Sequence, residues 1–169
     1  MPVLETTRLI LRELTLADAA LVFELVNEPL WLQFIGDRGV RTLADAEGYI
    51  RKACLASYAL HGFGLWLVRR RADGVSLGIC GLLKRDTHPD IEIGFALLQR
   101  FHGQGYAAEC AAATLNYARQ ALGLKRIAAN ASPGNAVSIR LLEKLGLHFE
   151  KMFQLTPAAP ELNLFAIDF

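Results

Sequence analysis

The fold of this chain is decided by the stretch QRFHGQGYAAEC (Gln99–Cys110), a glycine-rich turn between two periodic segments. Before the turn, apolar residues alternate with small or polar ones over residues 91–97, which predicts a β-strand. After it, residues 106–122 are rich in alanine, contain no proline and carry apolar residues at helical spacing. Glycines let the backbone approach a ligand, and the first N–H groups of a helix lack intrahelical partners. The stretch therefore predicts a phosphate cradle, although a lone G-x-G is more often an ordinary tight turn.

A second pattern follows downstream and has to be considered together with the first. Residues 125–131 (KRIAANA) predict a short strand, residues 132–134 (SPG) a turn, and Asn135 begins the helical stretch NAVSIRLLEKLGL. Asn135 suits the N-cap of this helix, and Gly146 suits the position just after its end. The strand, helix and strand over residues 90–131 predict a parallel, right-handed βαβ unit, whereas the hairpin over residues 63–84 must be antiparallel.

These motifs resemble those of the GNAT acyl-CoA N-acyltransferases, and specifically the branch of ribosomal-protein N-terminal acetyltransferases. ETTRLILRELTLADA (Glu5–Ala19) resembles that branch's first strand and helix start, EIGFALLQRFHGQGYAAE (Glu92–Glu109) its acyl-CoA motif, and NAVSIRLLEKLGL its following helix. The resemblance is close to full length and implies one domain over residues 1–169. It implies acetyl transfer from acetyl-CoA, as cosubstrate and without a metal, to a primary amine. The acceptor would be the α-amino group of a protein N-terminus or a small metabolite, attacking directly in a ternary complex.

The resemblance also implies which residues bind CoA. The pyrophosphate would bind to the backbone amides of Gly103, Gln104, Gly105, Tyr106 and Ala107, and the pantetheine arm to the backbone of Phe95, Ala96 and Leu97. Asn135 would bind the pantetheine from the other side, with Ser138 next to it on the same helical face. His102 stands where the wider family often has Arg or Gln. Since amides do most of the phosphate binding, we expect CoA affinity to survive that change.

The chemistry of amine attack on a thioester names further candidates. A backbone amide of residues 95–97 would stabilise the oxyanion. Many relatives protonate the departing thiolate with a tyrosine at the position that is Leu142 here, and leucine cannot donate a proton. In the resembling branch, a serine at the position of Ser138 can donate the proton instead. The alternative for Ser138 is a helix residue that bonds back to a carbonyl.

Glu92 is the best candidate for the base that deprotonates the amine, because it begins the strand leading to the thioester. It could instead be a solvated residue at a strand end, and His88, Asp90 or a water relay are alternatives. An α-amine with a pKa of about 8 is partly neutral at pH 7, whereas a lysine with a pKa of about 10.4 is almost entirely charged. An α-amine therefore needs less from a base, and we expect one as the acceptor.

The acceptor is expected to be recognised by residues 27–42, where Pro29 and Gly36 predict a loop. Large apolar residues of this loop, Trp31, Leu32, Phe34 and Ile35, either line the acceptor pocket or cover one end of the core. A second class of function stays open, a non-catalytic domain that binds or senses acyl-CoA without transferring its acyl group. Release of free CoA thiol distinguishes the two, because a sensing domain binds CoA without releasing thiol in the presence of an amine.

Composition excludes some classes of function. Lys and Arg number 18 against 17 Asp and Glu, so a net charge of +1 argues against a nucleic-acid binder. No apolar run reaches the length of a membrane span, and three widely spaced cysteines suggest a reducing compartment, so we expect a cytoplasmic protein without a membrane partner. Cys110, close to the cradle, is expected to serve packing rather than catalysis. A homodimer is left open.

The periodic segments together predict an α/β (α+β) fold, a mixed and mostly antiparallel sheet of seven strands flanked by about four helices. The resemblance adds a central parallel pair splayed at the CoA site. The strands are expected near residues 8–14, 63–71, 75–84, 90–98, 125–131, 147–154 and 161–168, and the helices near residues 16–28, 43–60, 105–122 and 135–145. A Rossmann fold fits poorly, because its fingerprint belongs near the first βα turn and has a third glycine.

Overall fold

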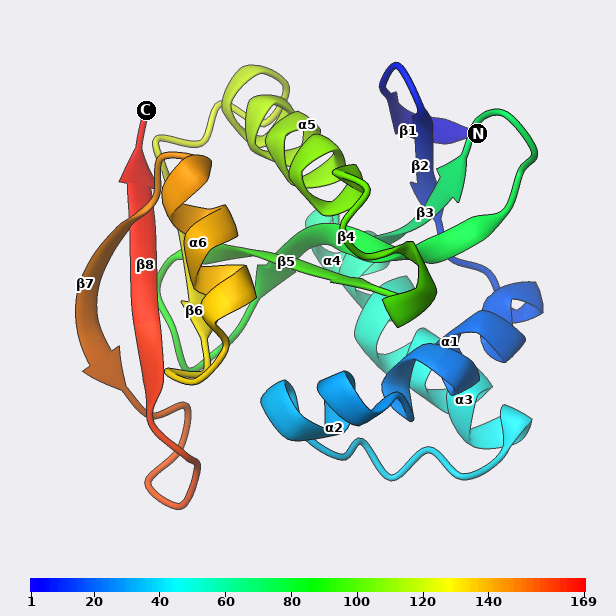
Figure 1. Cartoon of the computed structure of the whole chain (residues 1–169), viewed down its shortest axis with the longest axis horizontal. Coiled ribbons are helices and arrows are strands. Elements are labelled where there is room, and N and C mark those ends of the chain that lie inside the picture. Colours follow the sequence, from blue (N-terminus) through cyan, green and yellow to red (C-terminus); the bar gives the residue numbers. More distant parts are fainter.

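The computed structural model describes residues 1–169 and builds them around one eight-stranded sheet with the order β1-β2-β3-β4-β5-β6-β8-β7 (Figure 1). The strands are β1 (Pro2–Glu5), β2 (Leu9–Glu13), β3 (Leu65–Arg70), β4 (Ser76–Lys84), β5 (Ile91–Leu97), β6 (Arg126–Ala131), β7 (His148–Phe153) and β8 (Leu162–Asp168). Neighbouring strands are antiparallel except for β5 and β6, which are parallel. The predicted mixed, mostly antiparallel sheet with a central parallel pair is confirmed, and the Rossmann alternative is excluded.

The sheet has one strand more than the seven expected. The additional strand is β1, which pairs antiparallel with β2 at the edge of the sheet. Its four residues, PVLE, are too few to show a period-2 alternation, so no pattern in the sequence predicts it.

The helices cover both faces of the sheet. They are η1 (Leu16–Asp18), α1 (Ala19–Val26), α2 (Pro29–Phe34), α3 (Leu43–Tyr49), η2 (Ile50–Leu55), α4 (Ala56–His61), η3 (Gln99–Phe101), α5 (Tyr106–Gln120) and α6 (Ala136–Lys144). Segments α3, η2 and α4 form one continuous helical run, with a π-helical turn in its middle. In Figure 1, α5 lies above strands β3 to β5 and α1 to α4 lie below them, while α6 lies beside β6.

The segment predicted as a loop over residues 27–42 contains the short helix α2, and this part of the prediction was wrong. Pro29 does not break a helix here, because it occupies the first helical position, where no N–H is needed. Gly36, with φ of +106°, lies just beyond the end of the helix, in the left-handed region that glycine favours.

The core contains the three cysteines as free, buried thiols. Cys110 lies on the face of α5 that packs on the sheet, next to Ala111 and one turn from Thr114, and all three are 0% exposed. The contact with Cys80 and burial raise the pKa of Cys110 well above its ordinary value. A thiol held in its neutral form is a poor nucleophile, so Cys110 serves packing, as expected.

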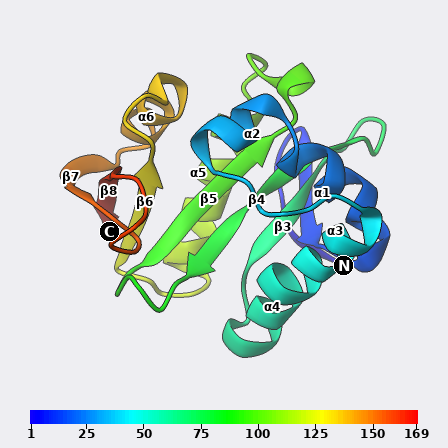
Figure 2. The same cartoon turned by 90° about the horizontal axis from the view of Figure 1, so that it is seen from below.

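The parallel pair β5 and β6 separates almost at once. Only Glu92 and Ala128 are in register, and Figure 2 shows the two strands running apart toward the end where α2 and α6 lie. On the other side of β5, the N–H of Leu98 donates to the carbonyl of Leu77. Because strand backbone groups alternate in direction, the N–H groups of Phe95 and Leu97 point away from β4, into the gap where β6 has departed.

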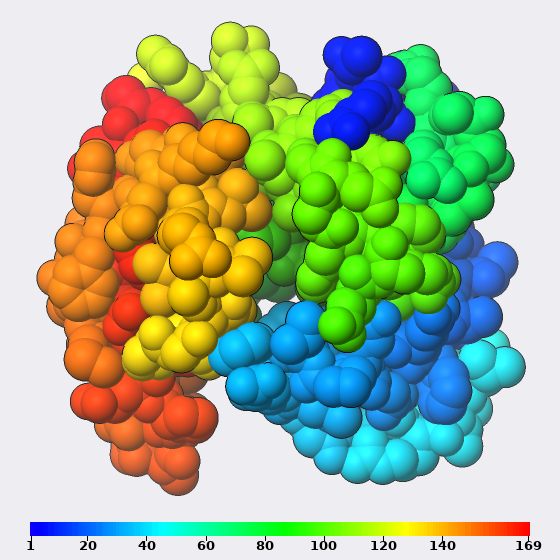
Figure 3. Space-filling view, in the orientation of Figure 1, coloured from blue at the N-terminus to red at the C-terminus, as the bar shows by residue number.

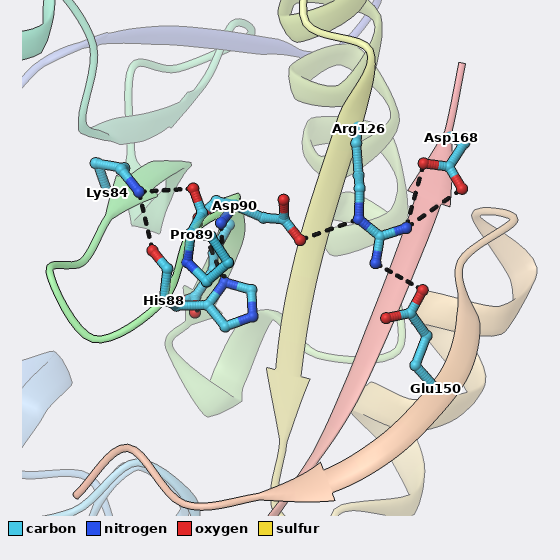
Figure 4. Close-up of polar contacts among 8 residues, drawn as sticks. Lys84, His88, Pro89, Asp90, Arg126, Glu150 and Asp168 are labelled. Atoms are coloured by element: carbon cyan, nitrogen blue, oxygen red, sulfur yellow. Dashed lines mark hydrogen bonds and ion pairs between the residues drawn. The ribbon is translucent and has the colours of Figure 1, made fainter.

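The closed end of this gap is tied together by Arg126 of β6 (Figure 4). Its guanidinium pairs with Asp90 just before β5 at 3.0 Å, with Glu150 of β7 at 2.6 Å and with Asp168 of β8 at 3.2 Å. These contacts, led by Glu150 and Asp90, raise the pKa of Arg126. Lys84 closes the adjacent turn by donating to the carbonyls of His88 and Pro89.

We expect Arg126→Ala to lower the free energy of unfolding by about 1–2 kcal/mol, because three partly exposed ion pairs are lost together. For a domain of this size the melting temperature should fall by about 2–8 °C, measured by calorimetry. Arg140→Ala is the matched control, since Arg140 is exposed on α6 and makes no ion pair. An equal loss in both variants would contradict the role of the Arg126 contacts.

Candidate active site

The glycine turn presents a row of free backbone donors. Gly103 and Gly105 adopt φ of +72° and +81°, the left-handed region that favours glycine, and Gly105 is the N-cap of α5. The first hydrogen bond into the helix runs from the N–H of Glu109 to the carbonyl of Gly105 at 3.1 Å. The six N–H groups of residues 103–108 donate to no acceptor in the protein. Such a row at the start of a helix is a site for a phosphate group.

Two side chains fix the turn. Nε2 of His102 donates to the carbonyl of Leu97 at 2.7 Å, and Arg8 donates from Nη1 to the carbonyl of Gln104 at 2.9 Å. Arg8 also pairs through Nε with Glu109 at 2.6 Å, which compensates the one carboxylate in the first turn of α5. The role of Arg8 has no signal in the sequence beyond its place in the first-strand motif.

His102 lies where the CoA motif was expected to begin, but its ring is engaged within the protein. The Leu97 carbonyl accepts from His102, which leaves one of its two lone pairs for another donor. Phe95 keeps both its backbone groups on the open side of β5, and Leu97 keeps its N–H there. The expected pairing of the pantetheine arm with residues 95–97 stays a prediction, and the open-side backbone groups of Phe95 and Leu97 are the candidates for it.

Two cavities meet at the gap between β5 and β6, where Figure 3 shows a hollow bordered by α6, the glycine turn and α2. One cavity, of about 370 Å³, is lined by the glycine turn and is called the turn cavity. The other, of about 290 Å³, contains Glu92 and is called the Glu92 cavity. Seven residues line both: Trp31, Phe34, Ile35, Phe95, Ala96, Asn135 and Ser138. Two ligands, one in each cavity, would meet at this shared wall.

Most of the residues expected at the CoA site line the turn cavity. They are Phe95, Ala96, Leu97, His102, Gly103, Gly105, Tyr106, Ala107, Asn135 and Ser138. Gln104 does not line it, because its side chain is exposed and donates to the carbonyl of Arg100 at 3.4 Å. In the loop segment, Leu32 also points away and is 41% exposed. Trp31 both lines the cavities and belongs to the core, so the two interpretations of this aromatic are compatible.

Asn135 and Ser138 lie at the start of α6, on the shared wall. The side-chain oxygen of Asn135 accepts the N–H of Ser138 at 3.2 Å, so Asn135 caps the helix as predicted. Its amide nitrogen remains available to a ligand. The hydroxyl of Ser138 makes no hydrogen bond within the protein, so the alternative of a bond back to a helix carbonyl is not adopted. Leu142, one turn later, is buried and lines the Glu92 cavity.

Glu92 is 1% exposed and is not the solvated strand-end residue of the alternative interpretation. Its Oε2 accepts from Nε of Arg85 at 2.8 Å and from Nδ2 of Asn130 at 3.2 Å. Its Oε1 is buried and has no hydrogen-bond partner. Nδ1 of His88 lies 4.0 Å from Oε1, beyond hydrogen-bond distance. A buried carboxylate oxygen without a partner is costly, and because Glu92 lines a cavity, a donor from a ligand can offset that cost.

The alternates to Glu92 lie outside both cavities. Nδ1 of His88 accepts the N–H of Asp90 at 3.2 Å, and the Asp90 carboxylate pairs with Arg126. Among the three candidate bases, only Glu92 lines one of the two cavities, and Nδ1 of His88 lies 4.0 Å from Oε1 of Glu92. No group of three or more His, Cys, Asp or Glu side chains is arranged to bind a metal ion. None of the helices has both the length and the apolar character needed to cross a membrane.

Comparison with known proteins gives consistent results. Residues 8–148 match the family model of the acetyltransferase (GNAT) domain. The N-acetyltransferase YoaA of Bacillus subtilis (strain 168), itself uncharacterized, is 30% identical over 150 residues, which are 88% of this chain and 84% of YoaA.

Solved structures show the same fold. An acetyltransferase from Agrobacterium tumefaciens str. C58 is 28% identical, with a TM-score of 0.83 over 100% of this chain and 95% of that one. RimL, a ribosomal L7/L12 α-N-protein acetyltransferase solved in complex with coenzyme A, has a TM-score of 0.83 over 99% of this chain and 98% of that one. At 15% identity, RimL shows likeness of fold alone. With its splayed β5–β6 pair, its free amides at the glycine turn and a family match over most of its length, this chain belongs to the GNAT family of acetyltransferases.

Proposed function

We propose that this acetyltransferase moves the acetyl group of acetyl-CoA directly to an α-amino group, of a protein N-terminus or a small metabolite, in a ternary complex. The observation that carries the proposal is the shared wall between two cavities. Free backbone donors line one cavity, and Glu92, whose Oε1 has no hydrogen-bond partner, lines the other. The arrangement gives each of two substrates its own site and lets them meet without a covalent enzyme intermediate.

The CoA side of the proposal uses groups that the protein leaves free. The N–H groups of residues 103–108 would bind the pyrophosphate. The carbonyl of Phe95 and the amide nitrogen of Asn135 would bind the pantetheine arm from its two sides. The Phe95 N–H would also stabilise the oxyanion, because a fixed donor beside the developing charge costs no reorganisation.

The proton transfers need a base for the amine and an acid for the thiolate. Glu92 would accept the proton through Oε1, since Oε2 is already bonded to Arg85 and Asn130. Ser138 would donate to the departing thiolate, since its hydroxyl is free and lies on the shared wall. The three free thiols support the further proposal that the protein acts in the cytoplasm.

Release of CoA thiol from acetyl-CoA tests the function directly, with peptides bearing free N-termini, N-blocked lysine peptides, polyamines and amino acids as acceptors. We expect thiol release that depends on a free α-amine. Binding of CoA in a thermal-shift assay without thiol release for any amine would instead favour the alternative, a domain that senses acyl-CoA. A sensing domain has no second substrate, so that alternative assigns no ligand to the Glu92 cavity.

We expect Ser138→Ala to lower kcat about tenfold to a hundredfold and to change the Kd for CoA by less than threefold, because the hydroxyl acts on the leaving thiolate rather than on bound CoA. Steady-state kinetics and calorimetric titration with CoA provide the two numbers. Ser132→Ala is the matched control, because Ser132 lines only the Glu92 cavity and its hydroxyl donates to the carbonyl of Phe34 at 3.1 Å. Equal losses of turnover and of CoA affinity would make Ser138 a binding residue only.

A further inference from the structure

The Glu92 cavity carries more positive than negative charge. Its charged lining residues are Arg38, Arg85 and Glu92. Glu92 and Arg85 pair with each other, so their charges compensate. Arg38 is exposed on the loop after α2 and makes neither an ion pair nor a hydrogen bond within the protein. One positive charge at this cavity therefore has no partner.

Arg85 also has donors to spare. Only its Nε is bonded, to Oε2 of Glu92, and its two terminal nitrogens donate to no acceptor in the protein. Its side chain is 31% exposed, so the guanidinium is neither enclosed nor fully solvated. The two terminal nitrogens of a guanidinium form a planar fork that matches a carboxylate or a phosphonate.

Tyr49 supplies a third donor. It ends α3 at the start of the π-helical turn and lines the Glu92 cavity, and its hydroxyl makes no hydrogen bond in the protein. Burial raises the pKa of Tyr49, and the nearby guanidiniums of Arg38 and Arg85 act in the opposite direction. Both guanidiniums line the same cavity as Tyr49, whose phenol stays protonated and can donate.

We propose that the acceptor carries an anionic group beside its amine, and that this anion binds to Arg38, Arg85 and Tyr49 while the amine binds to Oε1 of Glu92. The inference rests on the proposed function and narrows its substrate class. Glu92, which lines the same cavity and whose Oε1 has no hydrogen-bond partner, independently offers an acceptor for the amine. A ligand with both charges matches the cavity, whereas a polyamine would meet the unpaired guanidinium of Arg38.

The amine and the anion must be close together in such an acceptor. Arg85 contacts Glu92 at 2.8 Å, so an anion on the fork of Arg85 and an amine on Oε1 are only a few bonds apart. A free α-amino acid satisfies this spacing, and so does a peptide whose first residue is Asp or Glu. The cavity of about 290 Å³ accommodates one residue of this size more readily than a long chain.

The experiment compares matched acceptors with the full-length protein and acetyl-CoA. Free amino acids are set against their carboxamides, and peptides that begin with Asp or Glu against those that begin with Asn or Gln. We expect kcat/KM to be at least tenfold higher for the anionic member of one of the two pairs, because a charge-assisted contact is lost in the neutral member. The pair that responds identifies the source of the anion.

Variants then locate the anion site. Arg38→Gln and Tyr49→Phe should each lower kcat/KM for the anionic acceptor about tenfold, with little change for its neutral counterpart and an unchanged KM for acetyl-CoA. Arg51→Gln is the matched control, since Arg51 is exposed on the same helical run and lines neither cavity. That variant should behave as the wild type.

Three outcomes would overturn the inference. Equal rates with anionic and neutral acceptors would contradict the anion site but leave the proposed function standing. A preference for polyamines would do the same. Binding of CoA with no transfer to any amine would overturn the proposed function itself, and the inference with it.

Discussion

Glu92→Gln should lower kcat about a hundredfold or more at pH 7, with an unchanged Kd for CoA. The amide oxygen of glutamine can still accept from Arg85 and Asn130, so the buried contacts and the shape of the cavity are kept. The amide cannot accept a proton, and general-base catalysis typically contributes 10²–10⁴-fold. Steady-state kinetics with an α-amine acceptor measures the loss.

The loss should shrink as the pH rises, because an α-amine with a pKa of about 8 is mostly neutral at pH 9 and then needs less from a base. Glu143→Gln is the control, since Glu143 is exposed on α6 and lines neither cavity. Its activity should match the wild type at every pH. Full activity of Glu92→Gln at pH 7 would transfer the role of base to water.

Gly105→Val should weaken CoA binding a hundredfold or more. Gly105 has φ of +81°, and valine in that region costs about 1–3 kcal/mol, so the turn shifts to relieve the strain. The shift turns the free N–H groups of the cradle away from one another. Loss of two or more charge-assisted hydrogen bonds accounts for the expected change, which calorimetric titration with CoA measures.

Gly123→Val separates the effect on binding from the effect of backbone strain. Gly123 follows α5 at its other end, with φ of +65° and open space around its added side chain. The two variants should lose comparable stability in thermal unfolding, and only Gly105→Val should show weakened CoA binding. Unchanged CoA affinity in Gly105→Val would remove the glycine turn from the binding site.

Much of the fold could be predicted because the decisive elements have strong local patterns. The alternation over residues 91–97 and the alanine-rich run after Gly105 place β5 and α5 within a residue or two of their observed bounds. Helix α2 could not be predicted in the same way. Proline ends most helical patterns but suits a first helical position, and only packing against the rest of the protein decides between the two.

The candidate site likewise has one part that local sequence patterns predict and one part that they do not. The CoA-binding candidates lie in two short segments, the glycine turn with the strand before it and the start of α6, so local sequence motifs predict them. The second substrate's cavity is assembled from distant segments, and Tyr49, Arg38 and Arg85 carried no local signal. The burial of Glu92 could not be anticipated either, because it depends on Asn130 from the next strand of the sheet.

The single register pair between β5 and β6 has a consequence for how long the protein survives in a cell. Strands β6, β8 and β7 are joined to the rest of the sheet by little backbone pairing, so local opening should be easiest there. A CoA molecule that contacts both sides of the gap would oppose that opening, by about 1.4 kcal/mol for each tenfold excess over its Kd. Resistance to proteolysis should therefore rise with the concentration of acetyl-CoA.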